Sequence, residues 1–463
     1  MTTPLSMTDR LDRLPVTRFH RLLIAVVGVA TFFDLYDLFL ASTVSTVLSE
    51  EFGVSGDQTK PLLASAFLGA FVGAVALGRL ADRIGRRRAF LLTLSVYSLF
   101  TLLGAFSTDV WMLVICRFIA GVGIGAELPL ADAYLADLLP AHARGKATAW
   151  AYTIGFCGVP AAGFLARGLV GETPLGVEGW RWMFVIGALG AAIVWALRAG
   201  LPESPRWLIA QGRHDEADKV IRRLERSAGP LPDEERPAAD AAPEQEASPQ
   251  RFRSLFRRPW RTRSLMLAAF QILQVFGYYG FGSLVPIILT AKGFDVAHSL
   301  LFSALSFLGY PIGSALSIPI MERVQRKWLI VAAAAGMAVF GLAFGHATGS
   351  VAIPLLGFCY TAISNVFSNA YHTYQAEIFP TSLRATAAGT GYSLSRLATA
   401  AMPYLLLPLL DAQGATAVFL VVALAMVLLI LITAVFGPRT TGRSVDEISG
   451  ADAVTTSRPG RPS

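Results

Sequence analysis

Long apolar runs dominate this sequence and restrict what it can fold into. Each run covers about 18 to 25 residues, enough for a helix that rises about 1.5 Å per residue to cross a hydrocarbon layer of about 30 Å. Lipid offers the backbone no hydrogen-bond partner, so such runs must be helical. The pattern predicts an all-α polytopic membrane protein with twelve spans, near residues 19–43, 62–80, 89–106, 111–130, 146–165, 182–201, 265–289, 299–320, 328–346, 352–371, 387–409 and 415–436.

The basic residues are distributed unevenly between the connections of these spans. The formal net charge of +7 would suggest nucleic-acid binding in a soluble protein. Here the basic residues gather in alternate connections, namely Arg10, Arg13, Arg18 and Arg21, then Arg79, Arg83, Arg86, Arg87 and Arg88, then Arg323, Arg326 and Lys327. By the positive-inside rule, both termini and the long central segment are cytoplasmic. We therefore expect a protein of the cell (inner) membrane, with lipid and not nucleic acid as its surroundings.

A change of composition divides the chain. Residues 206–226 are basic and predicted to be helical, whereas residues 230–250 are rich in Pro, Ala and Glu, which is typical of disorder. We predict a six-helix bundle over residues 1–201, a partly disordered cytoplasmic loop over 202–263, a second six-helix bundle over 264–437 and a cytoplasmic tail over 438–463.

The two predicted bundles are internal repeats of each other. Gly69 and Gly73 recur as Gly309 and Gly313, while segments 82–87 and 134–144 recur as 322–327 and 374–384. All these pairs are separated by 240 residues, which separate coincidences would not produce. Six spans is an even number, so both copies enter the membrane in the same direction, and a substrate path is expected between them.

The connection between the second and third spans carries a motif. Segment 78–88 resembles the signature loop of the major facilitator superfamily, in which glycines allow a tight turn and an acid accepts bonds from arginines. The expected gating loop consists of Gly78, Asp82, Arg83, Gly85 and Arg86, with Glu322 and Arg326 of the second copy. The resemblance implies the major facilitator fold and secondary transport.

Narrower similarities point to a branch of that superfamily. Segments 117–125, 134–145, 180–182, 202–206 and 377–384 resemble sugar porters and their metabolite:proton symporter relatives. Segment 123–129 and the acid pair Asp34 and Asp37 are more similar to niacin and aromatic-acid:proton symporters, although Leu35 stands where the aromatic-acid branch has glycine.

Ionisable residues inside the spans carry most of the functional information, because a charge at mid-bilayer costs several kcal/mol unless it is paired or hydrated. Asp34 and Asp37 share one face of the first span, and counting along the helices puts Arg117 at a similar depth. Competition between a proton and Arg117 for a carboxylate would couple transport to protons; a permanent ion pair is the structural alternative. We assign proton coupling to Asp34, Asp37, Arg117 and Glu127, and favour Asp37 because Tyr36-Asp37 resembles the proton site of sugar porters.

Polar residues of the second bundle are the substrate candidates. Arg396 is predicted to lie near mid-membrane without an acidic partner in that bundle, so a carboxylate substrate is a natural counter-ion. The other candidates are Gln271, Gln274, Tyr278, Asn365 and Asn369, although such residues often only tie helices together.

The predicted function is proton-coupled symport of a small organic anion, an aromatic or pyridine carboxylate, by a monomeric unit through alternating access. The alternatives are a proton-coupled sugar porter, a drug/proton antiporter and a transport-inactive receptor. No nucleotide-binding, nucleophile or metal motif occurs, and Cys116, Cys157 and Cys359 lie inside apolar spans. We therefore expect no enzyme activity, no metal and no cofactor apart from the coupled proton.

Overall fold

The computed structural model describes residues 7–54, 56–140, 142–228, 252–257 and 260–440, and these ranges contain helices and no strand. The first half consists of α1 (Met7–Asp12), α2 (Arg18–Thr43), α3 (Ser45–Glu51), α4 (Gly56–Ile84), α5 (Arg86–Ala105), α6 (Val110–Leu138), α7 (Arg144–Phe156), α8 (Gly158–Leu169) and α9 (Gly179–Ala199). The short helices α10 (Pro205–Ala210) and α11 (His214–Ala228) follow. The second half consists of α12 (Arg261–Ala291), α13 (Val296–Phe307), α14 (Gly309–Arg323), α15 (Arg326–His346), α16 (Ala352–Glu377) and α17 (Thr381–Phe436).

Membrane-spanning helices account for most of these elements. Within the described residues, ten helices are long and apolar enough to cross a membrane, with α7 joined to α8 and α13 joined to α14. One of the ten, residues 386–436, is two helices that meet at Gly414, where φ is +78°. The 26-residue α16 is more polar and packs among them. This arrangement is consistent with the twelve predicted spans.

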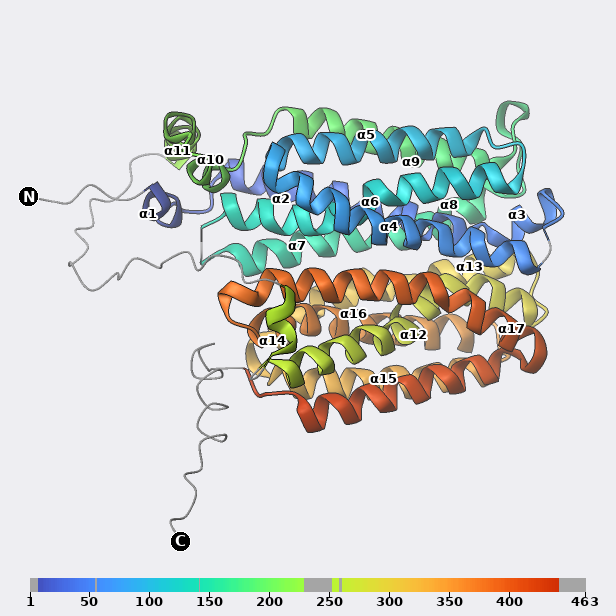
Figure 1. Cartoon of the computed structure of the whole chain (residues 1–463). Helices are drawn as coiled ribbons and strands as arrows, with labels where there is room; N and C mark the ends of the chain where they lie inside the picture. The colour runs from blue at the N-terminus through green and yellow to red at the C-terminus, as the bar shows by residue number, and fades with distance from the viewer. Residues whose placement is uncertain (1–6, 55, 141, 229–251, 258–259, 441–463) are drawn as a thin grey trace, which may run out of the picture.

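The helices form two stacked groups (Figure 1). Helices α2 and α4–α9 lie together, and α12–α17 lie together beside them. The end of the molecule that carries α1, α10 and α11 is called here the α11 end, and the opposite end, which carries α3, is called the α3 end. The contact between the groups runs mainly through α4 with α17, α8 with α13, and α7 with α14.

The internal repeat is visible in the way helices pack. A Cβ on Gly69 would lie 2.0 Å from the carbonyl oxygen of Phe118, and one on Gly309 would lie 2.3 Å from that of Phe358. Gly73 meets the carbonyl of Val122 in the same way as Gly313 meets that of Ala362. Each contact is related to its copy by 240 residues. Glycine is required at these positions because any side chain would force the two helices apart.

The two halves share a hydrophobic core toward the α3 end. Phe39 and Phe67 of the first half pack against Tyr279 of the second half, with ring centroids 6.4 and 5.5 Å away, and Phe156 stacks on Tyr310 at 6.2 Å. At the α11 end, a separate cluster of buried residues belongs to the first half alone within the described residues. The halves are therefore packed together at the α3 end more closely than at the α11 end.

Candidate functional site

The first half contains a fully buried ion pair in its middle. Arg117 Nη1 on α6 lies 2.5 Å from Asp37 Oδ2 on α2, and Arg117 Nη2 donates to the Asp37 carbonyl at 2.6 Å. Thr101 Oγ1 donates to the other carboxylate oxygen at 3.2 Å. Asp37 is thus paired with the arginine that depth counting placed beside it, and both of its carboxylate oxygens have partners.

Asp34 has a different environment, although it lies on the same helical face as Asp37. It is 1% exposed, and neither of its carboxylate oxygens has a hydrogen-bond partner within the described residues. The charges of Asp37, Glu127 and Arg198 all act on it. An ionised carboxylate without hydrogen bonds is costly in such a place, whereas a protonated carboxyl is tolerated far better.

Glu127 is paired with Arg198, near the end of α9. Arg198 Nη1 donates to Glu127 Oε1, and Thr93 Oγ1 donates to Oε2 at 2.8 Å. The guanidinium carbon of Arg198 lies 3.9 Å from the ring centroid of Phe90. The partner of Glu127 is therefore in the last span of the first half.

Most predicted substrate residues of the second half are hydrogen-bonded to neighbouring helices. Gln271 Nε2 donates to Gln375 at 3.0 Å, and Gln274 Nε2 donates to Ser395 at 2.8 Å. Tyr278 donates to Asn365 at 3.2 Å, Asn365 donates to the Tyr310 carbonyl at 2.5 Å, and Asn369 donates to Ser317 at 2.7 Å. These contacts tie α12 to α16 and α17, and α16 to α14. The contact of these residues with substrate stays a prediction.

Arg396 on α17 differs from these residues because it carries a charge, and two of its three guanidinium nitrogen atoms lack a partner among the described residues. It is 2% exposed, and its Nη2 donates to Tyr392 Oη at 2.5 Å. Its guanidinium carbon lies 4.5 Å from the ring centroid of Tyr392 and 5.0 Å from that of Tyr279. Nε and Nη1 have no hydrogen-bond partner among the described residues. Aromatic faces stabilise a cation, but only an acceptor satisfies its free N–H groups.

A second set of polar residues lies between the halves toward the α11 end. Tyr152 Oη donates to Asp132 Oδ1 at 3.1 Å, and Tyr152 also interacts electrostatically with Tyr371 and Tyr392 of the other half. Asp132 and His372 occupy equivalent positions of the two repeats, and both are exposed. The charge of Arg396 acts on His372. Asp132, Tyr152 and His372 thus border the solvent-accessible space next to Arg396.

The predicted gating loop is partly described. Gly85 has φ of +98° and begins α5, and Arg86 Nε lies 3.9 Å from Asp137 at the end of α6. The second copy repeats this contact, since Arg326 lies 2.9 Å from Glu377. Gly78 and Arg83 lie in the last turns of α4. The side chains of Asp82 and Glu322 lie outside the described part of the structure. Each described ionic contact joins helices of one half.

Sequence reasoning overlooked several residues of this site. Arg198 lies close to the predicted end of its span, where a long basic side chain usually reaches the interface instead of pairing inside. Tyr392 precedes Arg396 by one helical turn, so the spacing was a usable signal. Asp132 lies outside the predicted span 111–130, and only the position of its copy His372 would have drawn attention to it.

Two packed groups of membrane-spanning helices, related by an internal repeat and containing buried charges, have the architecture of a membrane transporter of the major facilitator type. In agreement, a solved structure of the xylose transporter XylE from E. coli, in a partially occluded inward-open conformation, superimposes with a TM-score of 0.73 at 21% identity, covering 92% of this chain and 99% of XylE. At that identity the likeness establishes the fold alone.

The family model described as "Sugar (and other) transporter" matches residues 22–451, and the chain belongs to this family. It is 30% identical over 446 residues to the niacin transporter NiaP of Acinetobacter baylyi, covering 96% of this chain and all of that protein. It is also 30% identical over 378 residues to the gentisate transporter of Corynebacterium glutamicum, covering 81% of this chain and 77% of that protein. The protein is thus a multi-pass membrane transporter and not an enzyme.

Proposed function

We propose that this protein is a proton-coupled symporter of a small aromatic or pyridine carboxylate. The observation that carries the proposal is Arg396, a buried guanidinium with tyrosine rings beside it and with two nitrogen atoms that lack acceptors among the described residues. A carboxylate offers two acceptor oxygens to a guanidinium, and an aromatic ring attached to it can pack on Tyr279 and Tyr392. Niacin and gentisate, which give two relatives their names, are both aromatic carboxylates.

We propose Asp34 as the site of the coupled proton. Asp37 and Glu127 each have an arginine partner, whereas Asp34 has none within the described residues. Protonation of Asp34 therefore breaks no ion pair. The proposal of Asp34 replaces the preference for Asp37 that the sequence suggested. It rests on the pairing of Asp37 with Arg117, which Asp34 lacks among the described residues.

Counting charges shows how the two bound species depend on each other. Arg263 and Lys327 are buried at the starts of α12 and α15, where they donate to backbone carbonyls. The other buried charged groups of the described residues are three carboxylates, Asp34, Asp37 and Glu127, and three guanidiniums, Arg117, Arg198 and Arg396, so the empty site formed by these six has no net charge. A bound anion alone gives −1, a bound proton alone gives +1, and both together restore zero. A buried uncompensated charge is expensive, so only the empty and the doubly loaded sites favour closure of the path.

The remaining features of the proposal follow the positive-inside rule and the fold. We place the α11 end in the cytoplasm, so that both termini are cytoplasmic and the protein resides in the cell (inner) membrane. Alternating access would then close the α11 end while the α3 end opens. A single chain contains all the residues named above, so we propose a monomer as the functional unit. The proton is the only coupling species in this proposal.

Counterflow in proteoliposomes tests the proposal. Purified protein is reconstituted in vesicles that contain an unlabelled compound, and uptake of the labelled compound is followed for nicotinate, gentisate, nicotinamide and xylose. We expect exchange of the two acids and none of nicotinamide, because the amide has no charge for Arg396. Exchange of xylose without exchange of acids would establish the sugar-porter alternative, and exchange of none of the four would contradict the proposed substrate class.

A further inference from the structure

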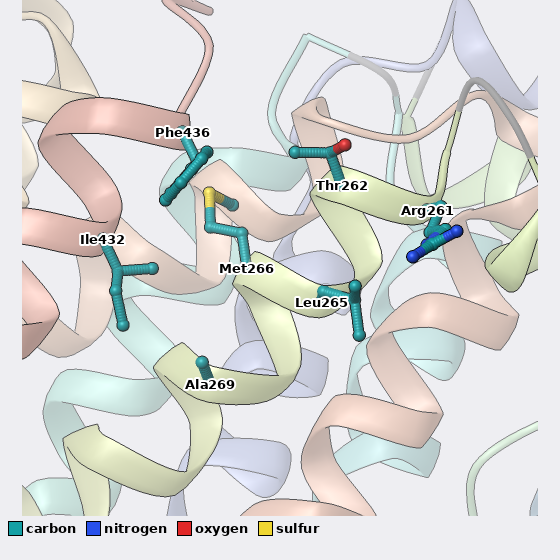
Figure 2. A pocket seen from close by; sticks show the side chains of 7 residues that line it. All are labelled: Arg261, Thr262, Leu265, Met266, Ala269, Ile432 and Phe436. Atoms are coloured by element: carbon teal, nitrogen blue, oxygen red, sulfur yellow. The ribbon is translucent and has the colours of Figure 1, made fainter.

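One cavity of the described structure lies outside the path between the halves. It has a volume of about 500 Å³ and is lined by Arg261, Thr262, Leu265, Met266 and Ala269 of α12 together with Ile432 and Phe436 of α17 (Figure 2). Leu265 is 50% exposed and Phe436 is 54% exposed. In a membrane protein, exposed apolar residues on spanning helices face lipid, so this cavity opens toward the bilayer.

The cavity follows the direction of α12. Its five lining residues on that helix lie at positions i, i+1, i+4, i+5 and i+8, which is one face of a helix about 12 Å long at 1.5 Å per residue. Ile432 and Phe436, one turn apart, form the opposite wall, and Met266 points toward Phe436 in Figure 2. The result is a groove parallel to the spans.

The groove changes from polar to apolar along its length. Arg261 and Thr262 begin α12, and Phe436 ends α17, so this mouth lies where the spans leave the hydrocarbon layer. Leu265, Met266 and Ala269 continue the groove inward without a polar group. This order matches a phospholipid, which has a charged phosphate followed by acyl chains.

The charges near the mouth are positive. Arg261 is exposed, and no acidic residue lines the cavity. Behind the opposite wall, the buried Lys327, which does not line the groove, donates through Nζ to the carbonyl oxygen of Gly437, the residue that follows Phe436, at 2.8 Å. Basic pockets between spanning helices attract anionic lipid headgroups.

We propose that this groove is a binding site for one anionic phospholipid, whose phosphate binds Arg261 and Thr262 and whose acyl chain lies along Leu265, Met266 and Ala269. The site joins the first helix of the second half to its last. It is separate from Arg396, and it does not depend on the identity of the transported substrate.

Native mass spectrometry of the full chain tests this site. The protein is released from detergent micelles after incubation with phosphatidylglycerol or phosphatidylcholine of equal chain length, and the bound fraction is measured as a function of lipid concentration. We expect one phosphatidylglycerol per chain to bind at least about tenfold more tightly than phosphatidylcholine. Arg261→Gln should lose about tenfold in affinity for phosphatidylglycerol and little for phosphatidylcholine, since a charge-assisted bond is lost.

Two further variants separate this site from general charge attraction. Arg257→Gln removes an exposed arginine that does not line the groove, and it should bind phosphatidylglycerol like the wild type. Ala269→Phe fills the apolar part while leaving the mouth unchanged, and it should weaken binding of both lipids. Substrate counterflow by each variant confirms that it is folded. Equal binding of the two lipids by the wild type, or equal losses with Arg257→Gln and Arg261→Gln, would overturn the proposal.

Discussion

Replacing Asp34 by asparagine should separate substrate exchange from proton-driven accumulation. Asn has the shape of a protonated Asp but cannot release a proton. In the variant, two carboxylates face three guanidiniums, so the empty site carries +1 and the anion-loaded site is neutral. The loaded carrier can therefore change access as before, whereas return of the empty carrier becomes costly. Counterflow needs only the loaded carrier, and net uptake needs both.

The size of the effect follows from the same charge count. One proton moves with one anion, so the membrane potential does no work on the pair, and a pH difference of one unit supplies about 1.4 kcal/mol. Wild-type protein should therefore accumulate substrate about tenfold per pH unit. An electrogenic cycle would instead gain about 2.3 kcal/mol per charge from each 100 mV.

Proteoliposomes with a potassium ionophore allow the pH difference and the potential to be set independently. Wild-type accumulation should follow the pH difference and ignore the potential, whereas Asp34→Asn should show no accumulation at either setting and counterflow within about threefold of wild type, since the loaded state keeps its charge. Asp37→Asn is the comparison, because it leaves Arg117 buried without its partner and should cost about 3–5 kcal/mol of stability. Full accumulation by Asp34→Asn, or loss of its counterflow in folded protein, would refute the assignment.

Three other changes have defined outcomes. Arg396→Lys keeps the charge but loses the planar fork, and should weaken equilibrium binding of a labelled carboxylate by about one to two decades; an unchanged affinity would remove Arg396 from the site. Gly73→Ala places a Cβ 2.0 Å from a backbone carbonyl of α6 and should lower the thermal unfolding midpoint, whereas Gly78→Ala, which meets open space, should not. The hydrogen bond from Arg10 lowers the pKa of Asp218, so this link between α1 and α11 is complete above the ordinary Asp pKa and is lost as the pH falls through the lowered value. Arg10 also donates to Glu225 of α11 at 2.8 and 2.7 Å. Spin-label distances between α1 and α11 should lengthen only in acid, and the double variant Asp218→Asn, Glu225→Gln should show the longer distance at neutral pH.

The sequence predicted the helices and the relation between the halves because both depend on local or periodic signals. Apolar length identifies spans, and the shared offset of 240 residues identifies repeats that pack alike. Two spans predicted as continuous are interrupted, and the reason is also local. α7 ends at Phe156 and α13 ends at Phe307, each four residues before a proline, Pro160 and Pro311. Proline cannot donate to that carbonyl, so the helix breaks there.

The pairing of charges was less accessible to sequence reasoning. Asp34 and Asp37 lie on one face of one helix, and nothing local distinguishes an acid that meets Arg117 from one that meets no partner. The distinction depends on how α2, α6 and α9 are oriented around their axes. Glu127 was assigned to proton coupling because it lies inside a span, and its link to Arg198 only becomes visible once α9 takes its place in the bundle.

The positions of the ionic contacts explain how the site can control movement of whole halves. Arg86–Asp137 and Arg326–Glu377 each join helices within one half, so they stiffen each half without linking the two. The two groups that we propose to bind the ligands are on opposite sides of the junction, Asp34 on α2 and Arg396 on α17. A proton at the first and an anion at the second therefore change the charge on both facing surfaces. Because the halves share their apolar core at the α3 end, closing the α11 end must separate rings such as Phe39 and Tyr279. Separating these rings costs free energy. The doubly loaded junction is neutral, so no uncompensated buried charge adds to that cost.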